Sequence, residues 1–285
     1  MAERTLGSVC AMSALDVLAD WPVPTAAAAV VSTSGVMATF GETTARFRLA
    51  SVTKPLVARA VQVAIEEGAL ELDTPAGPEG STVRHLLAHA SGLAMLDDAV
   101  LAKPGTRRIY SNSGFRVLAE TLEAATEMSF GDYLTEAIFQ PLAMSDSALP
   151  GGAAEAGFGA VSTVADLASF AGDLLAPATV SPQMHAEAVT VQFPGLGGVL
   201  PGYGSQRPND WGLGFELRDG KSPHWTGADN SASTFGHFGQ SGTFIWADPD
   251  AGLAAVVLTD RDFGEWAHTL WPSISDGILR EFGAH

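Results

Sequence analysis

Short apolar runs near both ends of the chain predict β-strands. Residues 26–32 and 36–40 are separated by a Thr-Ser-Gly turn, and residues 46–49 have the composition of a strand that continues the same sheet. Residues 243–247 and 253–259 form a second pair, and the Asp, Pro and Gly residues between them are typical of a hairpin turn. We therefore expect a sheet assembled from opposite ends of the sequence.

The region between these strands has the 3.6-residue periodicity of amphipathic helices. Thr82, Ser129 and Thr163 are candidate N-caps, and Asp follows the last two after three residues. The predicted helices span residues 55–67, 83–90, 114–125, 129–139 and 163–175. A last helix carries Leu270, Ile274, Ile278 and Phe282, with Pro272 in its first turns.

Residues 177–235 are rich in Gly, Pro and polar side chains. They predict loops with a few short strands, of which residues 212–217 are one candidate. Strands at both ends with helices between them indicate an α+β fold, in which an antiparallel sheet is flanked by helices, and not a βαβ series. We expect one domain over residues 1–285. Its sheet lobe comprises about 1–50 and 205–285, and its mostly helical lobe about 51–204.

The composition disfavours several functional classes. The chain of 285 residues carries 32 acidic and 15 basic residues, and its net charge of −17 opposes nucleic-acid binding. No run of about 18 apolar residues is present, and the apolar run at 26–31 is too short and too far along the chain for a signal peptide. We therefore expect a cytoplasmic protein without a membrane segment. Cys10 is the only cysteine, which excludes an intramolecular disulfide and a Cys-based metal site.

The first candidate for chemistry is Ser51-Val52-Thr53-Lys54, where a strand gives way to a helix. Free N–H groups at a helix N-terminus favour a developing oxyanion. Residues i and i+3 share a helix face, so the Lys54 amine can reach the Ser51 hydroxyl. Because a free serine is a poor nucleophile, it needs such a neighbour to accept its proton. The alternative is an N-cap serine followed by a surface lysine.

Two further segments carry polar groups that such a site needs. In Tyr110-Ser111-Asn112 the first and third side chains point the same way if the loop is extended, and a nearby lysine ammonium would make the phenol a general base. Residues 236–242, Gly-His-Phe-Gly-Gln-Ser-Gly, precede a strand, and their glycines would let a backbone N–H approach a ligand as an oxyanion donor. A buried tyrosine at a helix start and a flexible hairpin loop are the structural alternatives.

Together, Ser51-x-x-Lys54, Tyr110-x-Asn112 and His237-x-Gly239 resemble the motifs of the serine β-lactamase and penicillin-binding-protein superfamily in order and approximate spacing. The likeness is to its class C branch, which includes D,D-peptidases and family VIII carboxylesterases, and it covers most of residues 25–260. The supporting blocks are Phe47–Lys54, Thr82–Leu93, Ser162–Leu167 and Trp211–Phe215.

The resemblance implies a β-lactamase/transpeptidase-like fold and a covalent acyl-enzyme on Ser51. Lys54 would influence which groups of the site carry protons, and Tyr110 would activate Ser51 and later the deacylating water. Asn112 would contact the acyl side chain. The resemblance implies no metal and no cofactor.

At the third motif the sequence departs from the family. Lactamases usually carry Lys-Thr-Gly there, where Lys and Thr help to hold a substrate carboxylate, whereas this chain has His237-Phe238-Gly239. Phe238 cannot donate a hydrogen bond, which weakens the case for β-lactams. Gln240 would supply the second oxyanion N–H. The chain is also shorter than typical class C enzymes, chiefly between residues 150 and 235, where the pocket is shaped.

The sequence therefore predicts a serine hydrolase that acts on a small-molecule ester, amide or β-lactam. Ester or amide hydrolysis of a small uncharged acyl substrate is the first choice. A β-lactamase or D,D-carboxypeptidase is the alternative, and a non-catalytic binding protein on this fold is a further one. His85 and His89 have the spacing of helical metal ligands but lack the Glu of a His-Glu-x-x-His motif, so no metal site is predicted. The sequence carries no signal for a particular oligomeric state.

Overall fold

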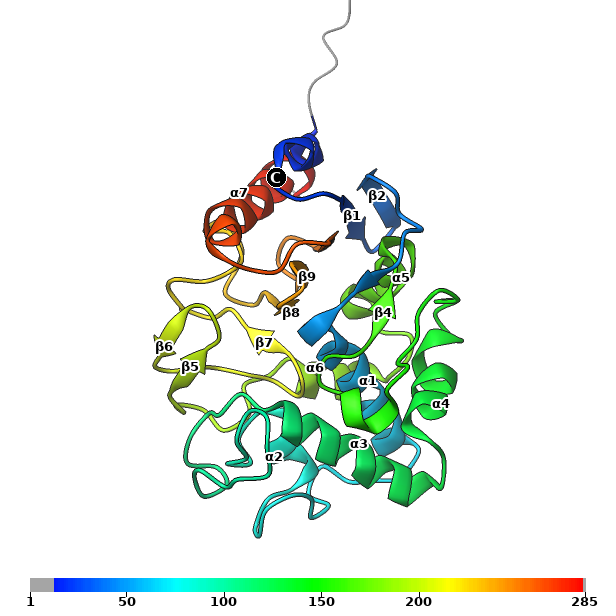
Figure 1. Ribbon diagram of the computed structural model, residues 1–285, viewed down its shortest axis with the longest axis vertical. Helices are drawn as coiled ribbons and strands as arrows, with labels where there is room; N and C mark the ends of the chain where they lie inside the picture. The colour runs from blue at the N-terminus through cyan, green and yellow to red at the C-terminus, as the bar shows by residue number, and fades with distance from the viewer. Residues whose placement is uncertain (1–12, 284–285) are drawn as a thin grey trace, which may run out of the picture.

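The computed structural model describes residues 13–283 and is built around a six-stranded antiparallel sheet with the order β2-β1-β10-β9-β8-β7 (Figure 1). Cys10 lies outside the described residues. The strands of the sheet are β1 (Ala26–Ser32), β2 (Gly35–Phe40), β7 (Glu216–Leu217), β8 (Phe235–Gly239), β9 (Thr243–Asp248) and β10 (Leu253–Thr259). β1 pairs with β10 along its whole length, from Ala26 opposite Thr259 to Ser32 opposite Leu253. The predicted closure of the sheet by distant segments is confirmed.

Most of the helices gather in the lower half of Figure 1, below the sheet. The α-helices are α1 (Thr53–Glu66), α2 (Val83–Leu87), α3 (Asn112–Thr126), α4 (Phe130–Leu134), α5 (Val164–Leu175), α6 (Pro182–Ala188) and α7 (Glu265–Phe282). Short 3₁₀ segments are η1 (Ala14–Asp20), η2 (Ala50–Val52) and η4 (Gly152–Glu155), and η3 (Thr135–Phe139) is a π-helical turn. None of the described helices has the length and apolarity needed to span a bilayer.

Alternating side chains of β1 enter two separate cores. Ala27 and Ala29 belong to a large core shared with α1, α3 and α5, whereas Ala28 and Val30 face a second core under α7 and η1. Both faces of the central strands are therefore covered, which explains their continuous apolar sequence. The α+β fold, an antiparallel sheet flanked by helices, is as predicted.

Two predicted strands are shorter than expected. Residues 46–49 do not continue the large sheet, because β3 (Phe47–Arg48) pairs with β4 (Val161–Ser162) in a separate ribbon. Residues 212–217 contribute only the two residues of β7. Gly214 has a φ of +89°, and a Cβ placed on it would lie 2.1 Å from the Cβ of Ala58 on α1, so this backbone turns where it packs closely on the helix.

The helix boundaries differ at several points. α2 ends at Leu87 and not at residue 90, because the chain reverses there and His89 has a φ of +54°. α7 begins at Glu265, so Pro272 lies in its interior and not in its first turns. Residues 177–235, predicted as loops with a few short strands, do contain the short strands β5 (Gly198–Leu200) and β6 (Gly204–Gln206). They also contain α6, a helix capped by Ser181 that was not predicted.

Candidate active site

The turn before α1 presents Ser51 at the junction of sheet and helices. Ser51 lies in η2, directly after Ala50, whose φ of +46° is unusual for a residue with a side chain and stores strain of about 1–3 kcal/mol. β8 packs against this turn, and a Cβ on Gly239 would lie 2.3 Å from the Leu49 carbonyl oxygen. Gly239 is therefore required for the strand to come this close to Ser51.

The amine of Lys54 is buried and surrounded by oxygen atoms. Its Nζ lies 2.6 Å from Asn112 Oδ1, 2.6 Å from the Gly157 carbonyl oxygen and 3.2 Å from Ser51 Oγ. Burial lowers the pKa of Lys54 well below its usual value of 10.5. The amide and carbonyl oxygens can only accept hydrogen bonds, so Lys54 Nζ donates to both of them.

The phenol of Tyr110 approaches Ser51 from the other side. Its hydroxyl lies 2.6 Å from Ser51 Oγ and 3.5 Å from His237 Nε2. Burial raises the pKa of Tyr110 above its usual value of 10.0, and the hydrogen bond with Ser51 offsets only part of this effect. Burial favours the neutral form of both groups and so opposes the predicted deprotonation of the phenol.

The third motif is strand β8 and not a flexible loop. His237 Nδ1 lies 2.6 Å from the Phe238 carbonyl oxygen, so Nδ1 carries the hydrogen and the Nε2 lone pair faces Tyr110. Burial lowers the pKa of His237 to about 3, which makes the ring neutral at pH 7. Within residues 13–283 the Gln240 N–H has no hydrogen-bond acceptor, whereas the Gln240 carbonyl accepts a bond of 2.7 Å from the Phe263 N–H.

A cavity of about 70 Å³ opens at Ser51. Its remaining lining comes from Met95, Tyr110, Leu200, Pro201, Trp211, Glu216, His237, Phe238 and Gln240. The Glu216 carboxylate is ion-paired with Lys221 and lies 2.8 Å from His224 Nε2. Burial alone would raise the pKa of Glu216, but His224 and Lys221 lower it to about 2. The charge of Glu216 is thus balanced inside the wall, and none of the described residues that line the cavity is an unpaired cation.

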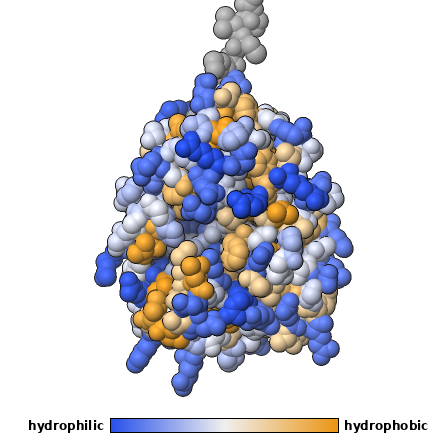
Figure 2. Space-filling view, in the orientation of Figure 1, coloured by the Kyte–Doolittle hydropathy of each residue, from blue (hydrophilic) through white to orange (hydrophobic). Residues whose placement is uncertain are grey.

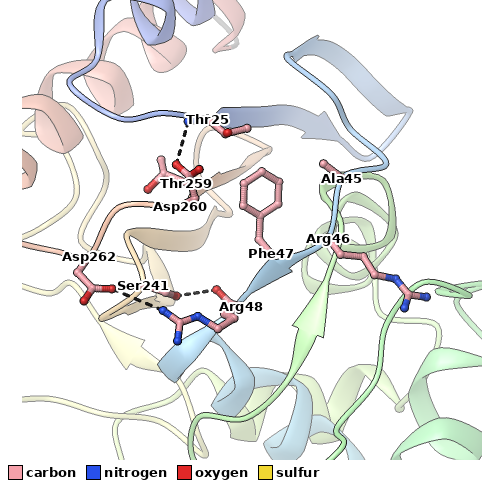
Figure 3. A pocket seen from close by; sticks show the side chains of 9 residues that line it. All are labelled: Thr25, Ala45, Arg46, Phe47, Arg48, Ser241, Thr259, Asp260 and Asp262. Carbon is pink, nitrogen blue, oxygen red and sulfur yellow. Dashed lines mark hydrogen bonds and ion pairs between the residues drawn. The ribbon is translucent and has the colours of Figure 1, made fainter.

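A second hollow, of about 320 Å³, lies beside β3 and contains none of the predicted site residues (Figure 3). Ser241 Oγ in its wall donates to the Arg48 carbonyl oxygen at 2.6 Å, and the Thr25 N–H donates to Asp260 Oδ1 at 2.8 Å. The first bond joins β3 to the segment that follows β8, and the second joins the start of β1 to the end of β10. The hollow therefore supports the position of Gln240 but has no nucleophile paired with a base.

The structure brings together Ser51, Lys54, Tyr110, Asn112 and the residues of the third motif. The Gly157 carbonyl carries no side-chain signal in the sequence and could not be predicted. The wall residues Met95, Trp211 and Glu216 were not predicted either, although Trp211 lies within one of the family-like blocks.

Arg108 and the two histidines with metal-ligand spacing make structural contacts. Arg108 is buried and donates to the carbonyl oxygens of Ala88, Asn209 and Gln192, so it cannot hold an anionic substrate. His85 lies 2.9 Å from Thr82 Oγ1, and His89 accepts a hydrogen bond from the Ser111 N–H. In the described part of the chain no group of three His, Cys, Asp or Glu side chains is placed to hold a metal ion.

The sequence model of the beta-lactamase family matches residues 17–274, which is nearly the whole chain. The chain belongs to the beta-lactamase family. A crystal structure described as a beta-lactamase from Mycobacterium bovis is 69% identical, with a TM-score of 0.95 over 95% of this chain and 100% of that one. EstCE1, described as a hydrolase with promiscuous acyltransferase activity, is 17% identical, with a TM-score of 0.76 over 93% of this chain and 96% of that one.

A curated relative, penicillin-binding protein 4* of Bacillus subtilis (strain 168), is 30% identical over 139 residues. This match covers 37% of the chain and 31% of the relative, so the chain matches about a third of that protein's length. The matches agree on a family of serine hydrolases related to β-lactamases and penicillin-binding proteins.

Proposed function

We propose that this member of the beta-lactamase family is a serine esterase that forms an acyl-enzyme on Ser51. One observation carries the proposal: the Tyr110 hydroxyl donates to Ser51 Oγ at 2.6 Å, and Lys54 Nζ lies 3.2 Å from the same oxygen. In its neutral form, the Lys54 amine can accept the proton of Ser51. A nucleophile between a proton donor and a proton acceptor, all within hydrogen-bonding distance, is equipped for acyl transfer.

In the acylation step, Ser51 Oγ attacks the substrate carbonyl carbon and its proton passes to the neutral amine of Lys54. The carbonyl oxygen, now negative, accepts hydrogen bonds from the backbone N–H groups of Ser51 and Gln240. As the bond to the leaving oxygen breaks, the Tyr110 hydroxyl gives that oxygen its proton. The alcohol leaves, and the site then holds an acyl-Ser51, a Lys54 ammonium and a Tyr110 phenolate.

The same three groups reset the site. The Tyr110 phenolate removes a proton from water, and the hydroxide attacks the acyl carbon. When the bond to Ser51 Oγ breaks, the Lys54 ammonium returns its proton to that oxygen, and the carboxylic acid departs. Lys54 and Tyr110 are neutral again, which is the state that their burial favours.

The walls of the cavity favour an uncharged substrate. His237 is neutral, Phe238 contributes only a ring, and Lys221 is already paired with Glu216, so a substrate carboxylate would lose its hydration without gaining a partner. Amide hydrolysis by the same steps is the close variant. β-lactam hydrolysis is the second candidate, favoured by the 69% identity with a protein described as a beta-lactamase.

Labelling with a fluorophosphonate followed by mass spectrometry tests the proposal. We expect an adduct on Ser51 in the wild type and none in Ser51→Ala. Equal labelling of both proteins, or no labelling of either, would refute the acyl-enzyme. Turnover of p-nitrophenyl acetate and of nitrocefin then separates the two candidate activities. Faster turnover of nitrocefin would show that the protein is a β-lactamase and not an esterase.

A further inference from the structure

An open apolar groove continues outward from the cavity at Ser51. The groove has a volume of about 280 Å³ and shares three lining residues, Met95, Tyr110 and Pro201, with the cavity. Its outer walls are formed by Leu101, Ile109 and Val199 and by the two arginines that follow Thr106. The cavity and the groove are thus neighbouring parts of one surface, and Tyr110 lines both of them.

The groove opens through an apolar part of the surface. Leu101 is 61% exposed and Val199 is 53% exposed, and Figure 2 shows hydrophobic side chains gathered at the lower left, over β5 and the loops beside it. Large apolar side chains grouped on an acidic protein mark a binding surface. Arg108 uses its guanidinium internally, and Arg107 is exposed at the rim, where its charge stays in water.

We propose that this groove binds the apolar alcohol portion of an ester, while the cavity at Ser51 accepts only a short acyl group. The inference rests on the proposed function, in which Tyr110 protonates the leaving oxygen. Because Tyr110 lines both spaces, the oxygen beside its hydroxyl directs the leaving group into the groove. The cavity has about one quarter of the volume of the groove, so the longer part of the substrate belongs in the groove.

The effect of chain length can be estimated. Complete burial of a methylene group favours binding about fourfold. In a groove that is open on one side, about half of that surface is covered, which gives about twofold for each carbon. From methyl acetate to hexyl acetate we therefore expect kcat/KM to rise about 30-fold. From ethyl acetate to ethyl hexanoate we expect kcat/KM to fall, because the cavity accepts only a short acyl group.

The experiment measures kcat/KM by pH-stat for these two ester series. Leu101→Gln places a polar group in the groove and is expected to reduce the ratio of hexyl to methyl acetate about fivefold. Leu96→Gln is the matched control, because Leu96 is 75% exposed and does not line the groove, so its ratio should equal that of the wild type.

Each outcome decides between explanations. A preference for long acyl chains, or no dependence on alcohol length, overturns the inference. Equal losses in Leu101→Gln and Leu96→Gln also overturn it, because they indicate adsorption to the surface of substrate droplets. If hydrolysis of methyl acetate depends on Ser51 but the length profile is flat, this inference fails and the proposed function stands. Hydrolysis that survives in Ser51→Ala refutes the proposed function itself.

Discussion

Removing the Lys54 amine and the Tyr110 hydroxyl separately should reveal which group takes the proton of Ser51. Lys54→Met keeps a chain of similar size but removes the base, and a positioned base contributes about 10²–10⁴-fold in rate, or about 3–5 kcal/mol. The variant also leaves Asn112 Oδ1 and the Gly157 carbonyl oxygen without the amine they contact at 2.6 Å, at a cost of about 1–3 kcal/mol each. Loss of the buried amine offsets part of that cost, so we expect a folded protein.

The assay is the pre-steady-state burst of p-nitrophenol from p-nitrophenyl acetate. This leaving group needs little help from an acid, so Tyr110→Phe should keep a burst rate within about tenfold of the wild type. Because Tyr110→Phe lacks the phenolate that activates water, this variant should deacylate slowly and accumulate the acyl-enzyme. Lys54→Met should lose the burst by about 10²–10⁴-fold. With hexyl acetate, whose alcohol needs protonation, both variants should be slow.

The refuting result is specific. If Tyr110→Phe loses the burst with p-nitrophenyl acetate as completely as Lys54→Met does, then Tyr110 is the base and the argument from burial fails. Circular dichroism of both variants serves as the control for folding.

Three further predictions follow from burial and charge. The kcat/KM of the wild type should rise with pH as Lys54 loses its proton, well below pH 10.5, and should fall only above pH 10 as Tyr110 ionises. A fall that begins near neutral pH would contradict the raised pKa of Tyr110, and a rise that begins only near pH 10.5 would contradict the lowered pKa of Lys54. Asp173→Ala leaves Arg59 buried without the ion-pair partner that lies 3.1 Å away, so the variant should lose about 3–5 kcal/mol of stability, or about 10 °C in Tm. Loss of the exposed Asp146 should cost less than about 1 kcal/mol. Equal Tm shifts of the two variants in a thermal melt would refute this prediction. Phe238→Thr should lower the free energy of unfolding, measured in urea, by about 3 kcal/mol, because the ring packs among Trp225, Phe263 and Trp271. A decrease of less than about 1 kcal/mol would show that the ring contributes little to the core.

The sequence predicted those parts of the fold that depend on local pattern. β1 and β10 are apolar runs bounded by turn residues, and the predicted strand ranges agree with the structure. α6 was missed although Ser181-Pro182 is a sound helix start, because the Gly- and Pro-rich surroundings outweighed the cap. The interior position of Pro272 was missed because the burial of Ala267 and Trp271 against the sheet stabilises helical turns that precede it.

The candidate site could be predicted as a set of residues but not as a set of protonation states. The motif spacing identified Ser51, Lys54 and Tyr110, and the structure places all three in contact. The direction of each pKa shift depends on burial by segments far away in the sequence, and the loop that carries Gly157 is 103 residues from Lys54. Spacing alone could not show that the phenol would be harder to ionise and the amine easier to deprotonate.

The groove walls and the proton-transfer groups occupy different structural environments. Lys54 and His237 are held within the packed interior, whereas the side chains of Leu101, on a loop, and Val199, on β5, are exposed and belong to neither core. Substitutions at such exposed positions should therefore alter substrate choice at little cost in folding. A small group of positions near the site should therefore tolerate substitution without unfolding the protein. A mutant library confined to the loop before α3 and to β5 should yield many folded variants with changed substrate selectivity.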